Sequence, residues 1–513
     1  MRGLYNAAHV DRLPLGPLRM TLQARPSVLL VMALLCALLA GCTAPPDTGL
    51  RRGAIELTEC RLKDVSSAAW CGEWTVPENH DQPDGRKIKL HVAVLPAYVR
   101  SRAPDPLILL AGGPGQAASD IGKLALLFDA VRRSRDIVLI DQRGTGGSHP
   151  FACKLFDTLD PVVAMMQVAP DPLRLRECAA GFDGDPRQYT TPAFLSDLES
   201  VRAALGVGEV NLWGGSYGSR VALAYLRAYP DRIRSVIIDG VATTAMRIMF
   251  EALINGEAQL GATIADCGAN AACNAAYPRL ADDWTRLSRD YAQERTVTIT
   301  HPRTGERQIL GADFLAIDGA LRTLLYSAEY SAMIPELITR AAAGDLAPLF
   351  AASLRIVGDL GQGMNIGLQL SVVCAEDGQR VGADDRVRAR AYPIAATVLE
   401  RLDTACNGWP HGAVPGEFHQ PTTSDKPVLV FSGGLDPVTP AANGELAART
   451  LVAATHIVAP GYGHLVSPFG CAPRLVARFV DDGNAEHLPE DCVKALRTSK
   501  RPPFFVNRLE AKP

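Results

Sequence analysis

The amino-acid sequence predicts an α/β fold in which a mostly parallel sheet is covered by helices and carries an inserted helical cap. Short, fully apolar runs recur along the chain and stop at glycine or aspartate, as strands do when a sheet buries both of their faces. Helical segments separate these runs, and strand–helix alternation is typical of α/β proteins. The alternation stops near residue 246 and resumes after residue 420, which indicates an insertion.

Seven segments of the chain are predicted to form strands. Residues 87–95 (KIKLHVAVL) alternate apolar and polar side chains, which is typical of a half-buried strand. The other strands are short apolar runs at residues 106–111, 136–140, 210–213, 233–238, 427–431 and 456–459. Between them, residues 192–205 place apolar side chains at helical spacing, at Phe194, Leu198, Val201 and Leu205.

The segment from residue 246 to residue 420 is expected to be a helical cap. It is rich in Ala, Leu and Arg, contains helical runs such as residues 342–357, and lacks strands that end in glycine. The core is then expected in two parts, residues 55–245 and residues 421–513. Two independent domains are the alternative, but they would leave the sheet divided between the ends of the chain without a reason.

The N-terminal segment has the features of a targeting signal. Residues 27–40 (SVLLVMALLCALLA) form an apolar run that is too short for an ordinary membrane span, and Arg25 precedes it as the positive charge of a signal peptide. The run ends in LAGC, which resembles a bacterial lipobox whose cysteine, here Cys42, is lipidated and becomes the first residue of the mature protein. We therefore expect a lipoprotein signal peptide over residues 1–41 and a polar tether over residues 42–54.

This interpretation predicts an exported protein of the bacterial cell envelope, anchored to the membrane by a lipid such as palmitate on Cys42. An ordinary cleaved signal peptide that contains a cysteine is the alternative. The stretch before Met20 is long for the start of a signal peptide, so Met20 is a second candidate start site. Thr43, in place of an aspartate after the cysteine, favours the outer membrane if the cell is Gram-negative.

Cysteine usage agrees with export. Of 12 cysteines, Cys36 and Cys42 lie in the N-terminal segment and ten remain, and an even number in an exported chain predicts disulfides. Pairing neighbours along the chain gives the bridges Cys60–Cys71, Cys153–Cys178, Cys267–Cys273, Cys374–Cys406 and Cys471–Cys492. Sequence alone does not prove this connectivity. No C-x2-C or clustered His/Cys spacing indicates a metal site.

Charge and glycine patterns argue against nucleic-acid and nucleotide binding. The formal net charge of −3 gives no support for a nucleic-acid partner, which would require a basic face. The glycine-rich stretch AGGPG at residues 111–115 is not followed by G-K-[ST], and GGSYG at residues 214–218 lacks G-x-G-x-x-G spacing. We therefore expect no metal and no organic cofactor.

The stretch VNLWGGSYG, residues 210–218, leads an apolar strand directly into a serine between glycines. This is the G-x-S-x-G nucleophile elbow, a sharp strand-to-helix turn that exposes a serine hydroxyl above the sheet. A simple turn after the strand is the alternative. We take Ser216 as the candidate nucleophile, and its hydroxyl needs a base to become reactive.

Asp436 and His464 complete a Ser–Asp–His order along the chain. Each follows a predicted strand, on the edge where open α/β sheets place their sites. His464 would take the proton from Ser216 and return it to the leaving group, and Asp436 would orient the imidazole and stabilise its charged form. Alone, Asp436 could be a turn residue and His464 a loop residue.

Other acids and histidines fit the triad less well. Asp239 also ends a strand, but its neighbour Gly240 makes a turn equally suitable. His149 precedes the required chain order, and His91 lies within a strand.

Two backbone N–H groups are candidates for an oxyanion hole. One belongs to Tyr217, the residue after the nucleophile, and the other to the loop after an early strand. AGGPG occupies that place, so we assign Gly113, with Gly112 as the neighbouring possibility. Loss of one such donor typically costs about 3 kcal/mol of transition-state stabilisation.

Five motifs together resemble one family: AGGPG (111–115), DQRGTGGS (141–148), GGSYG (214–218), GGLDPVTP (433–440) and GYGH (461–464). They are similar to the prolyl and tripeptidyl aminopeptidase branch of the α/β-hydrolases, above all to secreted tripeptidyl aminopeptidases with a TAP-like C-terminal region. The resemblance spans about residues 55–495 and implies the α/β-hydrolase fold with Ser216, Asp436 and His464 as triad. Prolyl aminopeptidases often have histidine where this chain has Ala111, which favours the tripeptidyl side.

The resemblance also implies two supporting residues. Thr439 matches a threonine near the acid of some envelope members, and a helix N-cap before Pro440 is its alternative. An acidic residue of the cap region would bind the free amino terminus of the substrate. Glu376 is our candidate for that anchor, and an exposed surface glutamate is its alternative.

We therefore expect an envelope serine exopeptidase that releases short peptides, above all tripeptides, from free N-termini through an acyl-enzyme. Its expected partners are peptides with free N-termini and, through Cys42, the membrane. A carboxylesterase or lipase on the same fold and a prolyl aminopeptidase that removes single residues are alternatives, since fold does not set function. A non-catalytic envelope-binding lipoprotein with a decayed hydrolase fold is a further alternative.

Overall fold

The computed structural model describes residues 49–153, 171–360 and 363–506. Cys42 and the expected signal peptide lie outside these ranges, so the lipid anchor stays a prediction. The chain is already in the sheet at strand β1 (Gly49–Arg52), which pairs antiparallel with β2 (Ile55–Cys60). Part of the expected tether is therefore a strand.

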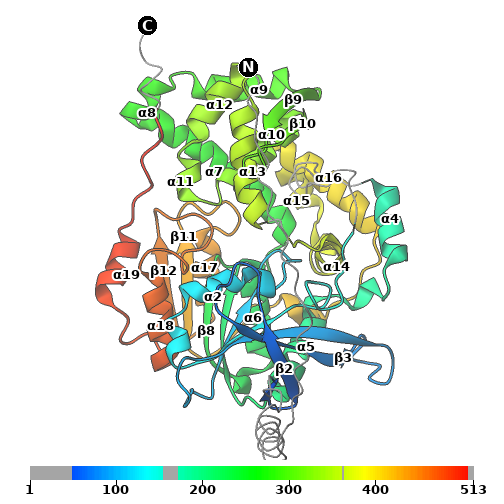
Figure 1. The fold of residues 1–513 in the computed structure, drawn as a ribbon. Helices are drawn as coiled ribbons and strands as arrows, with labels where there is room; N and C mark the ends of the chain where they lie inside the picture. Colours follow the sequence, from blue (N-terminus) through cyan, green and yellow to red (C-terminus); the bar gives the residue numbers. More distant parts are fainter. Residues whose placement is uncertain (1–48, 154–170, 361–362, 507–513) are drawn as a thin grey trace, which may run out of the picture. The chain divides into compact units, whose positions relative to one another are not determined.

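Within the described ranges the main sheet contains ten strands (Figure 1). Their order is β1, β2, β3 (Ala69–Pro77), β4 (Lys87–Leu95), β6 (Ile137–Ile140), β5 (Leu107–Leu110), β7 (Val210–Gly215), β8 (Ile233–Asp239), β11 (Val428–Gly433) and β12 (Ala454–Ala459). The strands from β1 to β6 pair antiparallel, whereas the strands from β6 to β12 run parallel. The predicted mostly parallel sheet is confirmed, and each predicted strand segment contains a strand.

Burial on both faces explains why these strands read as apolar runs. Every residue of β5, β6, β7 and β11 is buried. Successive side chains point to opposite faces, so Leu107 and Leu109 enter one core cluster while Ile108 and Leu110 enter the other. Strands β2 and β3, which the sequence analysis missed, are partly exposed and mix polar with apolar residues.

Helices cover both faces of the parallel strands. Helices α5 (Thr191–Ala204) and α6 (Tyr217–Ala228) contribute to the cluster that contains Ile108. Helices α2 (Gly122–Leu127), α18 (Ala472–Asp482) and α19 (Glu490–Arg497) contribute to the cluster that contains Leu107. Among the described residues outside the cap insertion, two further α-helices are α4 (Pro172–Gly181) and α17 (Ala441–Ala448).

The cap lies in the chain between β8 and β11. Its helices are α7 (Ile248–Ala269), α8 (Ala271–Ala276), α9 (Leu280–Asp290), α10 (Phe314–Leu324), α11 (Ala328–Ser331), α12 (Ile334–Ala342), α13 (Ala347–Leu360), α14 (Ile366–Glu376), α15 (Ala383–Ala389) and α16 (Pro393–Gly408). It also contains an antiparallel hairpin of β9 (Arg295–Thr300) and β10 (Arg307–Ala312), which the sequence analysis did not predict.

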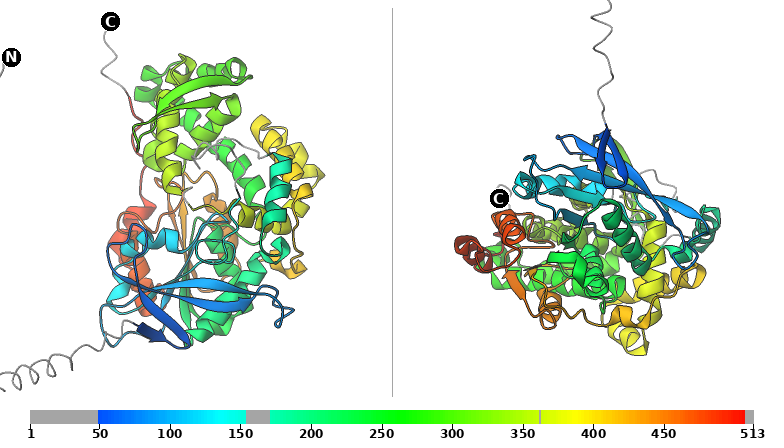
Figure 2. Two further views of the ribbon diagram at one scale, coloured as in Figure 1. Left: turned by 45° about the vertical axis from the view of Figure 1, so that its right-hand side comes forward. Right: turned by 90° about the horizontal axis from the view of Figure 1, so that it is seen from below.

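Two further boundaries differ from the sequence analysis. The run expected as one helix over residues 342–357 is broken, because Gly344 adopts φ +94° between α12 and α13. A left-handed glycine is a common helix terminator. The end of the chain was expected in the core, but the Phe505 N–H donates to the carbonyl of Ala332 in the cap at 2.9 Å. Figure 2 shows this red segment running beside the light-green cap elements.

All five predicted disulfides are confirmed within the described residues, with Cα–Cα distances between 5.1 and 5.8 Å. Cys374–Cys406 joins α14 to α16, and Cys471–Cys492 joins the start of α18 to α19. Disulfides of this number are typical of exported proteins. None of the helices in the described ranges has both the length and the apolar character of a membrane span.

Candidate active site

Ser216 lies at the sharp turn between β7 and α6. Its φ of +56° and ψ of −127° are rare for a residue with a side chain, and such strain is found at functional positions. The turn is possible because its neighbours lack side chains. A Cβ on Gly214 would lie 2.2 Å from the Gly218 carbonyl oxygen, and a Cβ on Gly218 would lie 2.2 Å from the Leu110 carbonyl oxygen. The G-x-S-x-G pattern is therefore a steric requirement of this turn.

Asp436 and His464 meet at the ends of β11 and β12. Nδ1 of His464 lies 2.9 Å from Oδ2 of Asp436, which also accepts a hydrogen bond from Oγ1 of Thr439 at 2.8 Å. Oδ1 of Asp436 accepts the backbone N–H groups of Val438 and Thr439, both at 2.8 Å. The alternative role of Thr439 as a helix cap is wrong, because Pro440 occupies the N-cap of α17 and Thr439 binds the acid instead.

The surroundings of His464 favour its charged form. Burial alone lowers the pKa of the imidazole, but the charge of Asp436, the hydrogen bond with it and the charge of Asp239 outweigh this effect and raise the pKa. Ser216 lies near His464 through the residues at the end of β8. The Ser216 N–H donates to the Asp239 carbonyl at 2.9 Å, and a Cβ on the next residue, Gly240, would lie 3.0 Å from Cε1 of His464. The three predicted triad residues are thus brought together at one edge of the sheet.

The AGGPG loop lies beside the nucleophile. A Cβ on Gly112 would lie 3.4 Å from the Ser216 Cβ, and Gly113 adopts φ +107°. Tyr217 is the first residue of α6, where a backbone N–H has no acceptor within its own helix. The partial positive charge of a helix N-terminus favours a negative oxygen at this point. Gly112 of this loop thus lies next to Ser216, and the oxyanion-hole roles of Gly113 and Tyr217 stay predictions.

Glu376 is buried, so its alternative as an exposed surface glutamate is wrong. Oε1 accepts the Thr191 N–H at 2.7 Å, and Oε2 lies 3.2 Å from Nη1 of Arg220. Burial raises the pKa of Glu376 to about 7. Through Thr191, whose hydroxyl lies 2.6 Å from the Tyr217 hydroxyl, Glu376 is linked to the residue after the nucleophile. Its role as a substrate anchor stays a prediction.

The cap touches the triad at residues that the sequence analysis did not identify. The Tyr326 carbonyl accepts the His464 N–H at 2.9 Å, and the two rings meet edge to face at 5.2 Å. Nδ2 of Asn255 on α7 donates to the Val438 carbonyl at 3.0 Å, two residues after Asp436. No local pattern marked Tyr326 or Asn255, because their partners lie far away in the sequence.

Two acidic residues lie on the cap helices α7 and α10. Burial, and then the charge of Asp318, raise the pKa of Glu257 to about 7, and Glu257 accepts the Ala395 N–H at 2.6 Å. Asp318 is fully buried and binds Arg322 through Oδ2. Among the described residues, no donor binds its other oxygen, Oδ1. The positive charge of Arg322 acts on both acids, through the contact with Asp318 and by lowering the pKa of Glu257.

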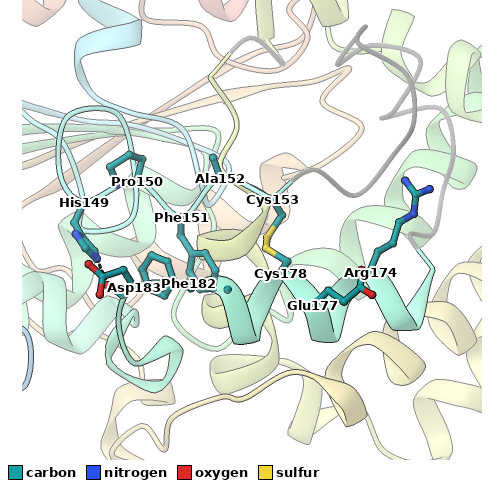
Figure 3. Close-up of a pocket in the computed structure, with 11 residues that line it drawn as sticks. His149, Pro150, Phe151, Ala152, Cys153, Arg174, Glu177, Cys178, Phe182 and Asp183 are labelled. Carbon is teal, nitrogen blue, oxygen red and sulfur yellow. Dashed lines mark hydrogen bonds between the residues drawn. A yellow bond between two sulfur atoms is a disulfide. The ribbon is translucent and has the colours of Figure 1, made fainter.

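A cavity of about 430 Å³ lies elsewhere, between the 149–153 loop and α4 (Figure 3). Figure 3 shows Phe151 and Phe182, whose rings stack at 3.6 Å, beside the Cys153–Cys178 bridge. Ser216, Asp436 and His464 do not line it. In the part of the chain that the structure describes, no cluster of His, Cys, Asp or Glu could hold a metal ion.

Two family models match the chain. One is described as the alpha/beta hydrolase fold and matches residues 105–338, and the other is described as TAP-like protein and matches residues 392–492. The first range contains Ser216, and the second contains Asp436 and His464. The candidate triad is therefore shared between the two matched regions.

Curated proteins similar to this chain carry peptidase names. A tripeptidyl aminopeptidase of Streptomyces lividans is 26% identical over 277 residues, covering 50% of this chain and 51% of its own length. Serine protease Hip1 of Mycobacterium tuberculosis is 27% identical, covering 43% of this chain and 46% of its own. A proline iminopeptidase of Neisseria gonorrhoeae is 32% identical, covering 28% of this chain and 36% of its own.

The chain thus spans about half the length of the first two of these relatives and about a third of the last. Among solved structures, a proline iminopeptidase of Mycobacterium smegmatis is similar to this chain, with 18% identity and a TM-score of 0.40. The match covers 80% of this chain and 98% of that one.

Proposed function

We propose that this chain, which matches the alpha/beta hydrolase fold model over residues 105–338 and the TAP-like model over residues 392–492, is a serine aminopeptidase. In this proposal it releases short peptides, above all tripeptides, from free N-termini. The observation that carries the proposal is the 2.9 Å pairing of His464 with a buried Asp436 beside the strained Ser216. Such a nucleophile, base and acid are the parts that acyl transfer requires.

The reaction proceeds in two stages. Oγ of Ser216 attacks the peptide carbonyl carbon while Nε2 of His464 takes its proton, and the N–H groups of Tyr217 and Gly113 stabilise the oxyanion. The intermediate collapses, the C–N bond breaks, and His464 returns the proton to the leaving amine. Water then attacks the acyl-enzyme with His464 again as base, which releases the short peptide and restores Ser216. Asp436 keeps the imidazole in the required tautomer throughout.

Restriction to chain ends requires a carboxylate that pairs with the substrate ammonium. Glu376, the candidate from the sequence, already has protein partners on both carboxylate oxygens. Glu257 is a second candidate, because it is only partly buried, lies beside Asp318, and shares helix α7 with Asn255, which binds the acid loop. We propose that one of these two glutamates selects free N-termini, and separate variants distinguish them.

The proposal also includes export and a lipid anchor on Cys42. Five disulfides within the described residues support an oxidising compartment. Replacement of Cys42 by serine should move the protein from the membrane to the soluble fraction and abolish its labelling by a fatty-acid probe. Retention in the membrane without label would contradict the anchor.

A side-by-side assay tests the proposed activity. Purified protein is given tripeptide, dipeptide and single-residue anilides with free amino ends, the acetylated tripeptide anilide, and a short-chain aryl ester. We expect cleavage of the free tripeptide anilide and little cleavage of its acetylated twin. Hydrolysis of the ester alone would identify an esterase, and release of single residues alone would identify the prolyl type. Ser216→Ala should be inactive but folded; full activity in this variant would refute the triad.

A further inference from the structure

The loop that carries His464 contains an unusual turn. Leu465, the next residue, adopts φ +73°, a left-handed conformation that is costly for a residue with a branched side chain. The backbone N–H groups that follow both point to Asp239. The N–H of Val466 lies 3.0 and 2.9 Å from its two carboxylate oxygens, and the N–H of Ser467 lies 2.6 Å from Oδ2. The turn is thus closed around one carboxylate.

Asp239 also contacts the nucleophile. It ends β8, is fully buried, and accepts the Ser216 N–H through its backbone carbonyl at 2.9 Å. The histidine loop is braced further from β7, since Nε1 of Trp213 donates to Oγ of Ser467 at 2.9 Å. One residue therefore joins the strained serine turn to the strained turn after the base.

The charge of Asp239 reaches the imidazole. Burial raises the pKa of Asp239 to about 6, while its hydrogen bonds with Ser467 and Val466 and the charge of His464 act in the opposite direction. The titratable groups around His464 are Asp436 on its Nδ1 side, Asp239 beneath the loop and the Tyr326 phenol of the cap. The charge of Arg322 lowers the pKa of Tyr326 and of Glu257.

We infer that Asp239 is a positioning residue for His464: its carboxylate holds the turn at Leu465 and adds a second negative charge near the imidazole. The inference rests on the proposed function, in which His464 is the base. Asp239 does not replace Asp436, because Nδ1 of His464 faces Asp436. Its part is to place the ring over Ser216 and to stabilise the imidazolium that forms when the serine gives up its proton.

The Asp239→Asn variant tests the charge. His464 must be neutral to act as base, so kcat/KM rises with pH through the pKa of the imidazole. A nearby negative charge raises that pKa. Asp239→Asn should therefore move the acid limb of the profile to lower pH, by about half a unit or more. It should also lower kcat by about tenfold or more with little change in KM, because the ring is less well placed.

Asp105→Asn is a matched control. Asp105 is also a buried carboxylate next to the sheet, bound by Arg135 and Asn211 at 2.9 Å each, but it precedes β5 at the amino ends of the parallel strands. Its replacement should lower the melting temperature and leave the midpoint of the pH profile in place. An unmoved acid limb in folded Asp239→Asn would overturn the inference, since a purely structural role predicts that result.

Asp239→Glu is the second variant, for use if Asp239→Asn does not fold. It keeps the charge but displaces the oxygens that the Val466 and Ser467 N–H groups bind. We expect lower kcat with the acid limb close to its wild-type position, and wild-type kcat would overturn the inference. An active Ser216→Ala would instead refute the proposed function, so the two failures are distinguishable.

Discussion

Nδ1 of His464 lies 2.9 Å from Oδ2 of Asp436, a residue 28 positions away in the chain. The two strands that precede them, β11 and β12, are parallel neighbours, so their carboxyl ends bring the acid and the base to the same edge of the sheet. The carboxylate of Asp436 accepts hydrogen bonds from its own loop, from the Val438 and Thr439 N–H groups and the Thr439 hydroxyl. This arrangement fixes one tautomer of the imidazole and leads to the first prediction.

Asp436→Asn should lower kcat on the order of 10⁴-fold while the protein stays folded. An amide cannot hold the imidazole in the tautomer that accepts the serine proton, and it does not stabilise the imidazolium. Steady-state kinetics on the preferred anilide measure the loss, and thermal unfolding checks the fold. A drop of less than about tenfold would show that another acid supports His464.

Gly218→Ala should destabilise the protein by more than about 2 kcal/mol. The added Cβ would lie 2.2 Å from the Leu110 carbonyl oxygen and 2.9 Å from that of Ala111, and neither backbone atom can move without disturbing β5 or the AGGPG loop. Urea denaturation measures the change in the free energy of unfolding.

Gly261→Ala is the control for this substitution. Gly261 lies inside α7, and among the described residues no atom outside the local helix lies within 4 Å of a Cβ added there. Alanine should stabilise the helix by up to about 1 kcal/mol. Equal stability of the two variants would contradict the steric explanation of the serine turn.

The pH dependence of KM should show which carboxylate binds the substrate ammonium. Burial, and then the charge of Asp318, raise the pKa of Glu257 to about 7, so the carboxyl is protonated below that pH in the free enzyme. A protonated carboxyl does not pair with an ammonium. If Glu257 is the anchor, KM for the free tripeptide anilide should rise as pH falls through about 7, and Glu257→Gln should raise KM and abolish this dependence.

Glu376→Gln separates the two candidate anchors. The pKa of Glu376 is also raised to about 7 by burial, so pH alone does not distinguish them. With Glu257 as anchor, the pH dependence of KM persists in Glu376→Gln. With Glu376 as anchor, the dependence is lost in that variant and persists in Glu257→Gln. Unchanged KM in both variants would remove both glutamates from substrate binding.

The ring of Tyr326, in the cap, should help to position the base His464. Its ring packs edge to face on His464 at 5.2 Å, so Tyr326→Ala removes one wall of the imidazole site. We expect a fall in kcat of about tenfold in Tyr326→Ala and of no more than about twofold in Tyr326→Phe, which keeps the ring. Kinetics at the pH optimum measure both, and an equal loss in both variants would assign the effect to the hydroxyl.

Local sequence patterns were sufficient for the parts of the molecule that obey local rules. Strands β5 and β6 are buried on both faces and are unbroken apolar runs, and the turn at Ser216 demands glycine on both sides. The order of nucleophile, acid and base follows from the order of the strands that precede them. The disulfides join cysteines that are neighbours in sequence, so even their pairing could be predicted.

The tertiary structure decided what depends on contacts between distant segments. The half-exposed strands β2 and β3 and the β9–β10 hairpin mix polar with apolar residues, so no continuous apolar run marked them. Asp239 looked like a turn residue because its partners, Val466 and Ser467, lie more than 200 positions later. Burial of Glu376 against Arg220 arises from packing α14 on α6. The sequence thus determined which reactive residues follow the strands, and the tertiary structure determined which charged residues lie around them.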